Sequence, residues 1–349
     1  MMELHPVIME DLHSILSASI SWDKLRHKTI LVTGANGLIG SYLVYTCLYL
    51  NDMLDLEISL IGLVRNRHTA CHRFGDFINR HDFRLLVQDI AAPIPKGLFV
   101  DYVLHGASQT SPKAFMDDPV GTIRANSLGT MNLLDFAVAC KATFMLLSTR
   151  EIYGAPPVGI PVVQESDYGI VDPTLVRSCY PESKRMAETL VAAYRHQFAV
   201  DASIVRLAHT YGPGMVIGDG RVVGDFISDY LHHRPIRMRS KGHTLLALTY
   251  VTDVICGIFL ELLDFPDWIY NISRDDEPIT VLALAQYICS LDPSQQMKII
   301  YDLCQTDGAE TGYVQHKVGI MDSQKAFRAG WKPAVTYQAG IKRLLGFYR

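Results

Sequence analysis

A tyrosine and a lysine spaced four positions apart, Tyr180 and Lys184, are the residues in this sequence best suited to proton chemistry. A tyrosine phenol has an ordinary pKa of about 10 and is a poor base at neutral pH. A lysine one helical turn later faces the same side, and its ammonium favours the phenolate. Tyr180 can then take a proton from a substrate hydroxyl. Taken alone, the spacing is a frequent chance match, and packing on a helix surface is the alternative interpretation.

A glycine turn, Gly34-x-x-Gly37-x-x-Gly40, lies far upstream of the tyrosine. It follows a short apolar strand predicted over residues 29–33 and precedes a helix predicted over 38–50. The first glycine permits a tight turn, and the second lets the backbone approach a pyrophosphate at the helix N-terminus. This is the context that a dinucleotide-binding turn requires, although an ordinary strand–helix turn is the alternative for the motif alone.

A serine–threonine pair, Ser148-Thr149, stands at the end of a predicted strand between these two motifs. Thr149 can hydrogen-bond the same substrate oxygen as Tyr180. The order of these motifs predicts an active site that moves a hydride between a dinucleotide and a carbinol carbon: first the glycine turn, then Thr149, then Tyr180-x-x-x-Lys184.

Residues after the second and third predicted strands bear on the choice of cofactor. Arg65 stands where an acidic residue would bind the ribose 2′-OH of NAD, and an arginine suits the 2′-phosphate of NADP. This favours NADP over NAD, with a solvated loop cation as the alternative. Asp89 is positioned to accept from the adenine amino group or, equally, to cap its own loop.

The composition excludes several classes of function. The chain has 349 residues, 49% hydrophobic and 19% charged, with a net charge of −4, so no basic face for nucleic acid is indicated. No apolar run approaches the roughly 18 residues of a membrane span, and the N-terminus does not resemble a signal peptide. Seven scattered cysteines lack metal-ligand spacing, which predicts reduced thiols, no metal site and a cytoplasmic location.

Alternating apolar strands and amphipathic helices predict an α/β fold with a doubly wound, Rossmann-like parallel sheet. Residues 1–27 are predicted to be a helical extension and 28–207 the NAD(P)-binding domain. Residues 208–349 are predicted to form mainly a smaller C-terminal substrate-binding lobe with returning sheet elements, joined by 155–179. We assign a predicted strand over 268–272 to this lobe.

From about residue 28 onward the chain resembles the extended short-chain dehydrogenase/reductases of the nucleotide-sugar epimerase/dehydratase family. The UDP-glucuronate decarboxylases and dTDP-glucose 4,6-dehydratases are the most similar branches. Besides the glycine turn, the segments that carry the resemblance are 102–108, 126–134, 148–154, 179–188, 219–223, 250–253 and 325–333.

The resemblance implies roles for particular residues. Glu151 stands where both branches carry a functional glutamate, with a structural ion-pair partner as the alternative. The implied catalytic residues are Thr149, Glu151, Tyr180 and Lys184. The implied cofactor residues are Gly34, Asn36, Gly37, Leu38, Ile39, Gly40, Arg65, Asp89, Ile90, Ala107, Tyr180 and Lys184. The implied substrate residues are Ser108, Arg150, His209, Arg221 and Arg237.

Three positions depart from the family pattern. Arg150 replaces the aspartic acid with which the dehydratases protonate the departing hydroxyl, and an arginine cannot act as that acid. Leu246 replaces an arginine that holds the diphosphate of the sugar nucleotide, and His209 replaces an asparagine. The diphosphate would then be held elsewhere, with three candidate cations: Arg221, Arg237 and Lys241.

The resemblance therefore implies an enzyme that oxidises C4 of a nucleotide-linked sugar with a tightly bound NAD or NADP. Decarboxylation of a nucleotide-linked uronic acid is the leading hypothesis. The alternatives are 4,6-dehydration, C4 epimerisation or reduction, and, in another class, a non-catalytic NADP-binding regulator. The family's habit also predicts a homodimer through helices near 126–140 and 180–197, the first of which is part of a long helix predicted over 120–140.

Overall fold

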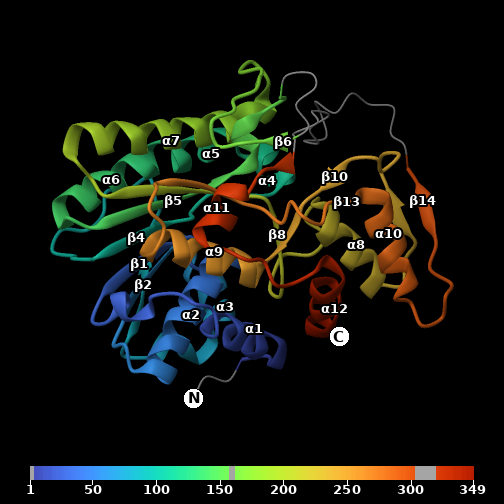
Figure 1. Ribbon diagram of the computed structural model, residues 1–349, viewed down its shortest axis with the longest axis horizontal. Helices are drawn as coiled ribbons and strands as arrows, with labels where there is room; N and C mark the ends of the chain where they lie inside the picture. Colours follow the sequence, from blue (N-terminus) through green and yellow to red (C-terminus); the bar gives the residue numbers. More distant parts are fainter. Residues whose placement is uncertain (1–3, 157–161, 303–319) are drawn as a thin grey trace.

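A seven-stranded sheet forms the centre of the molecule (Figure 1), seen in a computed structural model that describes residues 4–156, 162–302 and 320–349. Its strand order is β12-β7-β5-β4-β1-β2-β3, and every neighbouring pair is parallel. This confirms the predicted doubly wound α/β fold. The strands are β1 (Thr29–Thr33), β2 (Ser59–Val64), β3 (Phe83–Val87), β4 (Tyr102–His105), β5 (Thr143–Thr149), β7 (Ala202–Leu207) and β12 (Ile269–Ile272).

Helices cover both faces of the sheet, because its inner strands are apolar on both sides. On one face α2 and α9 pack together, and α1 lies against both. On the other face α5, α6 and α7 pack against one another and against the central strands. Their bounds are α1 (Pro6–Leu16), α2 (Leu38–Leu54), α5 (Pro119–Asn126), α6 (Leu128–Cys140), α7 (Cys179–Phe198) and α9 (Val251–Leu263).

The prediction of one long helix over 120–140 was wrong, because α5 and α6 are separate helices. Ser127 between them has φ −96° and ψ −67°. The Thr130 hydroxyl donates a hydrogen bond to the carbonyl of Asn126, four residues earlier. A side chain that binds a helix carbonyl in this way often bends a helix, and the break turns Asn126 towards α7.

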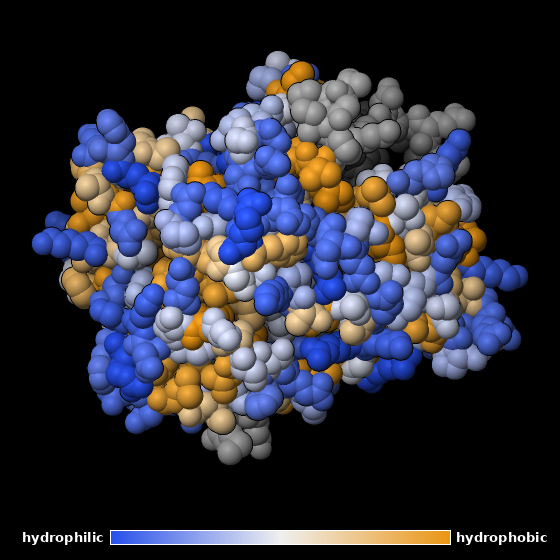
Figure 2. All heavy atoms as spheres, in the orientation of Figure 1, coloured by the Kyte–Doolittle hydropathy of each residue, from blue (hydrophilic) through white to orange (hydrophobic). Residues whose placement is uncertain are grey.

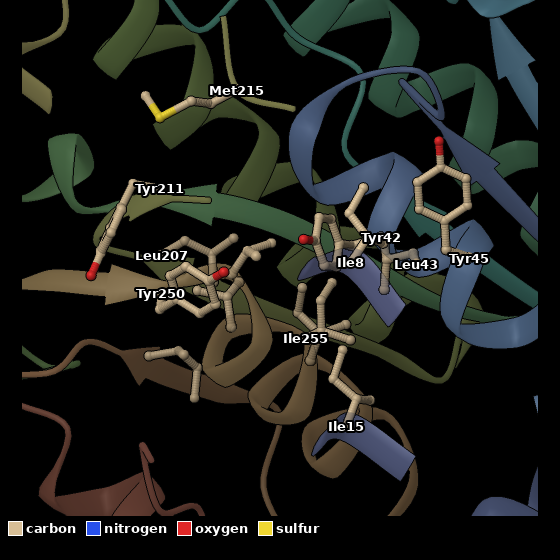
Figure 3. Packing of buried hydrophobic residues seen from close by; sticks show 14 of the residues in the cluster. Ile8, Ile15, Tyr42, Leu43, Tyr45, Leu207, Tyr211, Met215, Tyr250 and Ile255 are labelled. Carbon is tan, nitrogen blue, oxygen red and sulfur yellow. The ribbon is translucent and has the colours of Figure 1, made fainter. Parts of the chain in front are cut away.

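The N-terminal extension is part of the core. Figure 3 shows Ile15 of α1 in the same packed cluster as Tyr42 and Tyr250. The carboxylate of Asp11 is fully buried and accepts hydrogen bonds from the Tyr42 hydroxyl (2.7 Å), the Tyr250 hydroxyl (2.9 Å) and Arg343 Nη1 (2.9 Å). We call these four polar residues the Asp11 cluster. It joins both ends of the chain.

A smaller lobe lies to the right of the sheet in Figure 1. Helices α8 and α10 pack together there, beside three two-stranded sheets. The prediction that 268–272 belongs to this lobe was wrong, because β12 pairs with β7 at the edge of the main sheet. The lobe contains β8 (His209–Tyr211), α8 (Val222–Leu231), β9 (Ile236–Met238), β10 (Leu245–Leu246), β11 (Leu248–Tyr250), β13 (Ile279–Thr280), α10 (Val281–Ser290) and β14 (Ile299–Tyr301), and the chain ends with α12 (Tyr337–Tyr348).

The outer surface is mixed in polarity. Figure 2 shows hydrophilic residues over much of one face, with hydrophobic residues in small groups between them. Within the described ranges, no helix combines the length and the apolar character needed to cross a bilayer.

Candidate active site

The site lies where the strand order reverses, between β1 and β4. Thr33 at the end of β1 is in register with His105 at the end of β4. The carboxyl ends of these strands therefore bring the turn at Gly34 next to Ala107 and Ser108. The Ser108 hydroxyl donates a hydrogen bond to the carbonyl of the following residue (3.0 Å). Doubly wound sheets bind their ligands in the crevice at such a point.

The glycine turn has the geometry of a diphosphate cradle. Gly34 has φ +66°, and a Cβ there would lie 3.0 Å from the Cα of Ala107. A Cβ on Gly40 would collide with the carbonyl oxygen of Gly34. Helix α2 starts at Leu38, and its N-cap Gly37 has no side chain to satisfy the first N–H groups. Those N–H groups fit a dinucleotide's diphosphate, and Ile39 lies in the same turn.

The residues predicted to bind the adenosine end of the dinucleotide come shortly after β1, β2 and β3. Arg65 is exposed directly after β2. The Asn36 amide donates a hydrogen bond to the hydroxyl of Thr69, in the helix that follows β2 (2.9 Å). The Asp89 carboxylate accepts from the N–H of Ala91 (2.8 Å), which is the loop-capping role considered as its alternative. Ile90 is buried.

The structure brings together the tyrosine, threonine and lysine predicted from the sequence. Tyr180 on α7 is 7% exposed, and its phenol lies near enough to the Thr149 side chain at the end of β5 for Thr149 to lower its pKa. Lys184, one turn later on α7, is buried and donates from Nζ to the carbonyl of Leu147 (2.9 Å). Burial lowers the pKa of Lys184 to about 8, although the Glu188 carboxylate opposes the shift. The ammonium is therefore poised to lose its proton just above neutral pH.

Several groups act on the phenol in opposite directions. Burial raises the pKa of Tyr180, and the Glu151 carboxylate raises it further. The nearby Thr149 side chain and the charges of Arg177 and Arg221 lower the pKa of Tyr180. Burial dominates, so the protein alone keeps the phenol protonated. Added positive charge beside the ring would be needed to make Tyr180 a base.

A stack of side chains that the sequence analysis missed supports Glu151 and Tyr180. Arg177 Nη2 donates to both carboxylate oxygens of Glu151 (2.9 and 2.7 Å). The Arg177 guanidinium lies 4.8 Å from the ring centroid of Phe115. The Phe115 ring stacks on Tyr180 at 4.5 Å and 14°. The position of Arg177 three residues before Tyr180 was a usable signal, whereas nothing in the sequence pointed to Phe115.

Arg150 is the cation of this site that lacks close compensation. It makes no hydrogen bond and no close ion pair with any residue that the structure describes. Burial lowers the pKa of Arg150, an effect that Glu151 opposes and Arg177 reinforces. The pKa of His209 is held well below its ordinary value by burial and then by the Arg150 charge. Arg150 and a neutral His209 thus share one region with Glu151.

The three candidate cations for a diphosphate are placed differently. Arg221 is paired with Asp219 (2.8 Å) and is close enough to Tyr180 to affect its phenol. Arg237 and Lys241 are exposed, and nothing brings their side chains into contact with the catalytic residues. Leu246 is buried on β10. No group of three or more acidic, histidine or cysteine side chains in the described part of the chain could hold a metal ion.

Comparison with known proteins decides the family. Residues 30–273 match the model of the NAD dependent epimerase/dehydratase family, which spans well over half of the chain. The chain belongs to this family. The family's matched region covers the glycine turn, Thr149 and Tyr180-x-x-x-Lys184, so the resemblance predicted from the sequence is confirmed.

Members of the epimerase/dehydratase family with curated names are similar over most of the chain. A UDP-glucuronic acid decarboxylase 1 of Danio rerio is 31% identical over 323 residues, covering 92% of this chain and 72% of that protein. A UDP-glucuronic acid decarboxylase 3 of Arabidopsis thaliana is 32% identical over 314 residues, covering 89% of this chain and 86% of that protein.

Solved structures of epimerase/dehydratase proteins share the fold. An epimerase from Methanothermobacter thermautotrophicus has a TM-score of 0.77 at 19% identity, covering 99% of this chain and 96% of that one. A UDP-glucuronic acid 4-epimerase from Bacillus cereus, solved with UDP-glucuronic acid and NAD, has a TM-score of 0.76 at 21% identity. The match covers 91% of this chain and 98% of that one. At these identities the likeness shows the architecture alone.

Proposed function

We propose that the protein oxidises C4 of a nucleotide-linked uronic acid and decarboxylates the resulting 4-keto acid. The observation that carries this proposal is the Arg150 guanidinium, which lacks a close partner among the described residues and lies beside Glu151. Its planar fork matches a carboxylate in two parallel hydrogen bonds. A uronic acid would supply that carboxylate at C5. The relatives named as UDP-glucuronic acid decarboxylases support the same substrate class.

The first step is proton removal from the C4 hydroxyl by Tyr180. The Thr149 side chain favours the phenolate, and its hydroxyl is placed to orient the substrate hydroxyl. The glycine turn and the N-terminus of α2 fit a dinucleotide, and Lys184 follows Tyr180 by one turn of α7. When bound, NAD or NADP supplies the nicotinamide that accepts the C4 hydride and later returns it.

The second step uses the groups around Glu151. The bond between C5 and the carboxyl carbon breaks, CO₂ leaves, and the electron pair is delocalised into the 4-ketone as an enolate. Arg150 holds the carboxylate until the bond breaks. Glu151, fixed by Arg177, orients the ring or relays the proton that returns to C5. Arg150 cannot protonate a departing C6 hydroxyl, so the usual 4,6-dehydration is not supported by this site.

The test offers nucleotide-linked glucuronate and nucleotide-linked glucose separately, with either dinucleotide. The proposal expects CO₂ from the first and no 4-keto-6-deoxy sugar from the second. A 4-keto-6-deoxy product would contradict the role given to Arg150. Inversion at C4 with no CO₂ would favour an epimerase. Arg150→Met should abolish CO₂ release without loss of dinucleotide binding, and Arg67→Met on the exposed α3 (Arg67–Phe74) is a matched control.

We also propose that NADP is preferred. Arg65 is exposed where the second strand ends, so its guanidinium is free to meet a 2′-phosphate. Arg65→Asp should reverse the preference towards NAD, while Arg67→Asp makes the same charge change two residues away. NAD binding to the native protein about tenfold more tightly than NADP, measured by fluorescence titration, would contradict the idea.

A homodimer through α6 and α7 is the assembly we propose. Exposed apolar residues follow one stripe on α6, at Leu128, Met131 and Val138, and Met186 is exposed on the neighbouring α7. Such a stripe is typical of a face covered by another helix. Light scattering at micromolar concentration should give twice the monomer mass, and Met131→Lys should reduce it. Met53→Lys, at an exposed methionine of α2, is the control.

A cytoplasmic location is the remaining part of the proposal. The cysteines in the part of the chain that the structure describes are all free thiols, as expected in a reducing compartment. Cell fractionation should recover the protein with cytoplasmic markers, and recovery with an oxidising compartment would contradict this.

A further inference from the structure

A buried chain of polar side chains runs from β1 to α7. The Thr33 hydroxyl meets His105 Nδ1 (2.9 Å), and His105 Nε2 meets the Thr130 hydroxyl (3.0 Å). Thr130 donates to the carbonyl of Asn126, whose side-chain amide donates to Ser183 Oγ (2.9 Å). All five residues are buried, four of them completely and Ser183 at 4% exposed. Such a network must be satisfied within the protein.

The partners fix the direction of each hydrogen bond around the imidazole. The Thr33 hydroxyl oxygen accepts the N–H groups of Gly106 (3.2 Å) and Ala107 (3.1 Å), which occupies both of its lone pairs. Its own proton must therefore go to His105 Nδ1. The Thr130 hydroxyl proton is already given to a helix carbonyl, so Thr130 must accept from His105 Nε2. Only a neutral ring protonated on Nε2 satisfies both neighbours.

We propose that His105 is a positioning residue which, as the neutral Nε2–H tautomer, joins the cofactor loop to the catalytic turn of α7. At one end, the chain of hydrogen bonds holds the backbone of Gly106 and Ala107 against the glycine turn. At the other end, Ser183 precedes Lys184 and bonds the carbonyl of Tyr180 (3.1 Å). This proposal rests on the proposed function in one respect: the names cofactor loop, for Gly106 and Ala107, and catalytic turn, for the turn that holds Tyr180, assume that function.

The surroundings of His105 support the neutral state. Its ring lies 6.1 Å from that of Phe144, and the charged group that acts on it is the Lys184 ammonium. Burial first, and then this ammonium, lower the pKa of His105 to about 3. Protonation of Nδ1 would place two donors opposite each other and break the link to Thr33.

The first test is independent of activity. In protein with ¹⁵N-labelled histidine, one of the 13 histidine signals should show a protonated Nε2 and a bare Nδ1 from pH 8 down to pH 5. The signal is assigned by its loss in His105→Gln. A charged ring, or a proton on Nδ1, would overturn the proposal, and His105→Asn supplies the assignment if His105→Gln does not fold.

The second test separates the two ends of the chain of hydrogen bonds. Asn at position 105 retains an acceptor near Thr33, whereas Gln retains a donor towards Thr130. His105→Gln should therefore weaken dinucleotide binding about 10- to 100-fold. His105→Asn should mainly shift the pH profile of hydride transfer, because the link to α7 is lost.

Asp11→Asn is the control, since it disturbs an equally buried network away from the site. His105→Gln could lose stability as the control does while its dinucleotide affinity and pH profile stay unchanged. That result would give His105 a structural role alone and overturn the proposal. If the native protein binds neither NAD nor NADP, the proposed function fails instead, while the tautomer measurement still tests His105.

Discussion

Two sites that hold charged side chains, the Asp11 cluster and the candidate active site, treat charge in opposite ways. In the Asp11 cluster, one carboxylate meets two hydroxyls and an arginine, so its hydrogen-bonding capacity is largely used. In the candidate active site, Arg150 has no hydrogen bond to any described residue. Removing one partner of a buried, paired charge is costly, and a charge without partners costs stability unless a ligand completes it. The contrast is what we expect if the first region is structural and the second binds the proposed ligand.

The largest effect should come from Tyr180→Phe. Loss of the phenol removes the general base, so hydride transfer should fall by at least two to three orders of magnitude. The free energy of unfolding should change by less than about 1 kcal/mol, because the ring and its stacking on Phe115 remain. Single-turnover cofactor reduction and urea unfolding measure the two quantities. Near-normal turnover would contradict the catalytic assignment.

Asp11→Ala should show the reverse pattern. It leaves the Arg343 charge and two buried hydroxyls without their acceptor, so the free energy of unfolding should fall by about 3–5 kcal/mol. Turnover per folded molecule should stay near that of the native protein. Asp23→Ala, in an exposed pair with Arg26, is the control and should cost less than about 1 kcal/mol. Equal losses in the two variants would remove the contrast between the two regions.

Arg150→Met tests the candidate active site, the second region of the comparison. Removing a half-buried cation that has no hydrogen-bond partner should leave stability unchanged or raise it by about 1 kcal/mol. Affinity for a nucleotide-linked uronate should fall about 10- to 100-fold, because a charge-assisted, bidentate contact is lost. Calorimetric titration and thermal unfolding give both values. A marked loss of stability would show that Arg150 has a structural partner after all.

The smallest effect is the pH dependence due to Lys184. Its pKa of about 8 in the folded protein means that the ammonium one helical turn after Tyr180 is lost above that pH, so hydride transfer should decline. An unfolded lysine keeps its proton to about pH 10.4. The folded state therefore binds fewer protons between these values, and the Lys184 contribution to stability should rise across that window. A rate that stays flat to pH 10 would contradict the shift.

The sequence predicted what local chemistry determines. Gly34 is required by its left-handed backbone and Gly40 by its contact with Gly34 in the same turn, and Tyr180 and Lys184 share a face because a helix has a fixed period. The strand over 268–272 was recognised but misplaced, since apolar alternation does not say which strand is its neighbour. Arg177 and Phe115 were missed because their roles depend on which loops meet above the sheet.

Buried polar partners were the hardest to foresee. His105 was visible only as part of a strand, and its meaning depends on Thr33 and Thr130, which are distant in the sequence. Asp11 was read as part of an extension without function. Its acceptor role appears only when α1, α2, β11 and α12 are brought together by the fold.

The Asp11 cluster also has a consequence for biosynthesis. Asp11 and Arg343 are 332 residues apart, nearly the full length of the chain. At about 5–20 residues per second, a ribosome releases the arginine roughly 15–70 s after the aspartate. During that interval the first helix has no cation with which to bury its carboxylate. The contact between α1 and Arg343 can therefore form only after α12 has been synthesised.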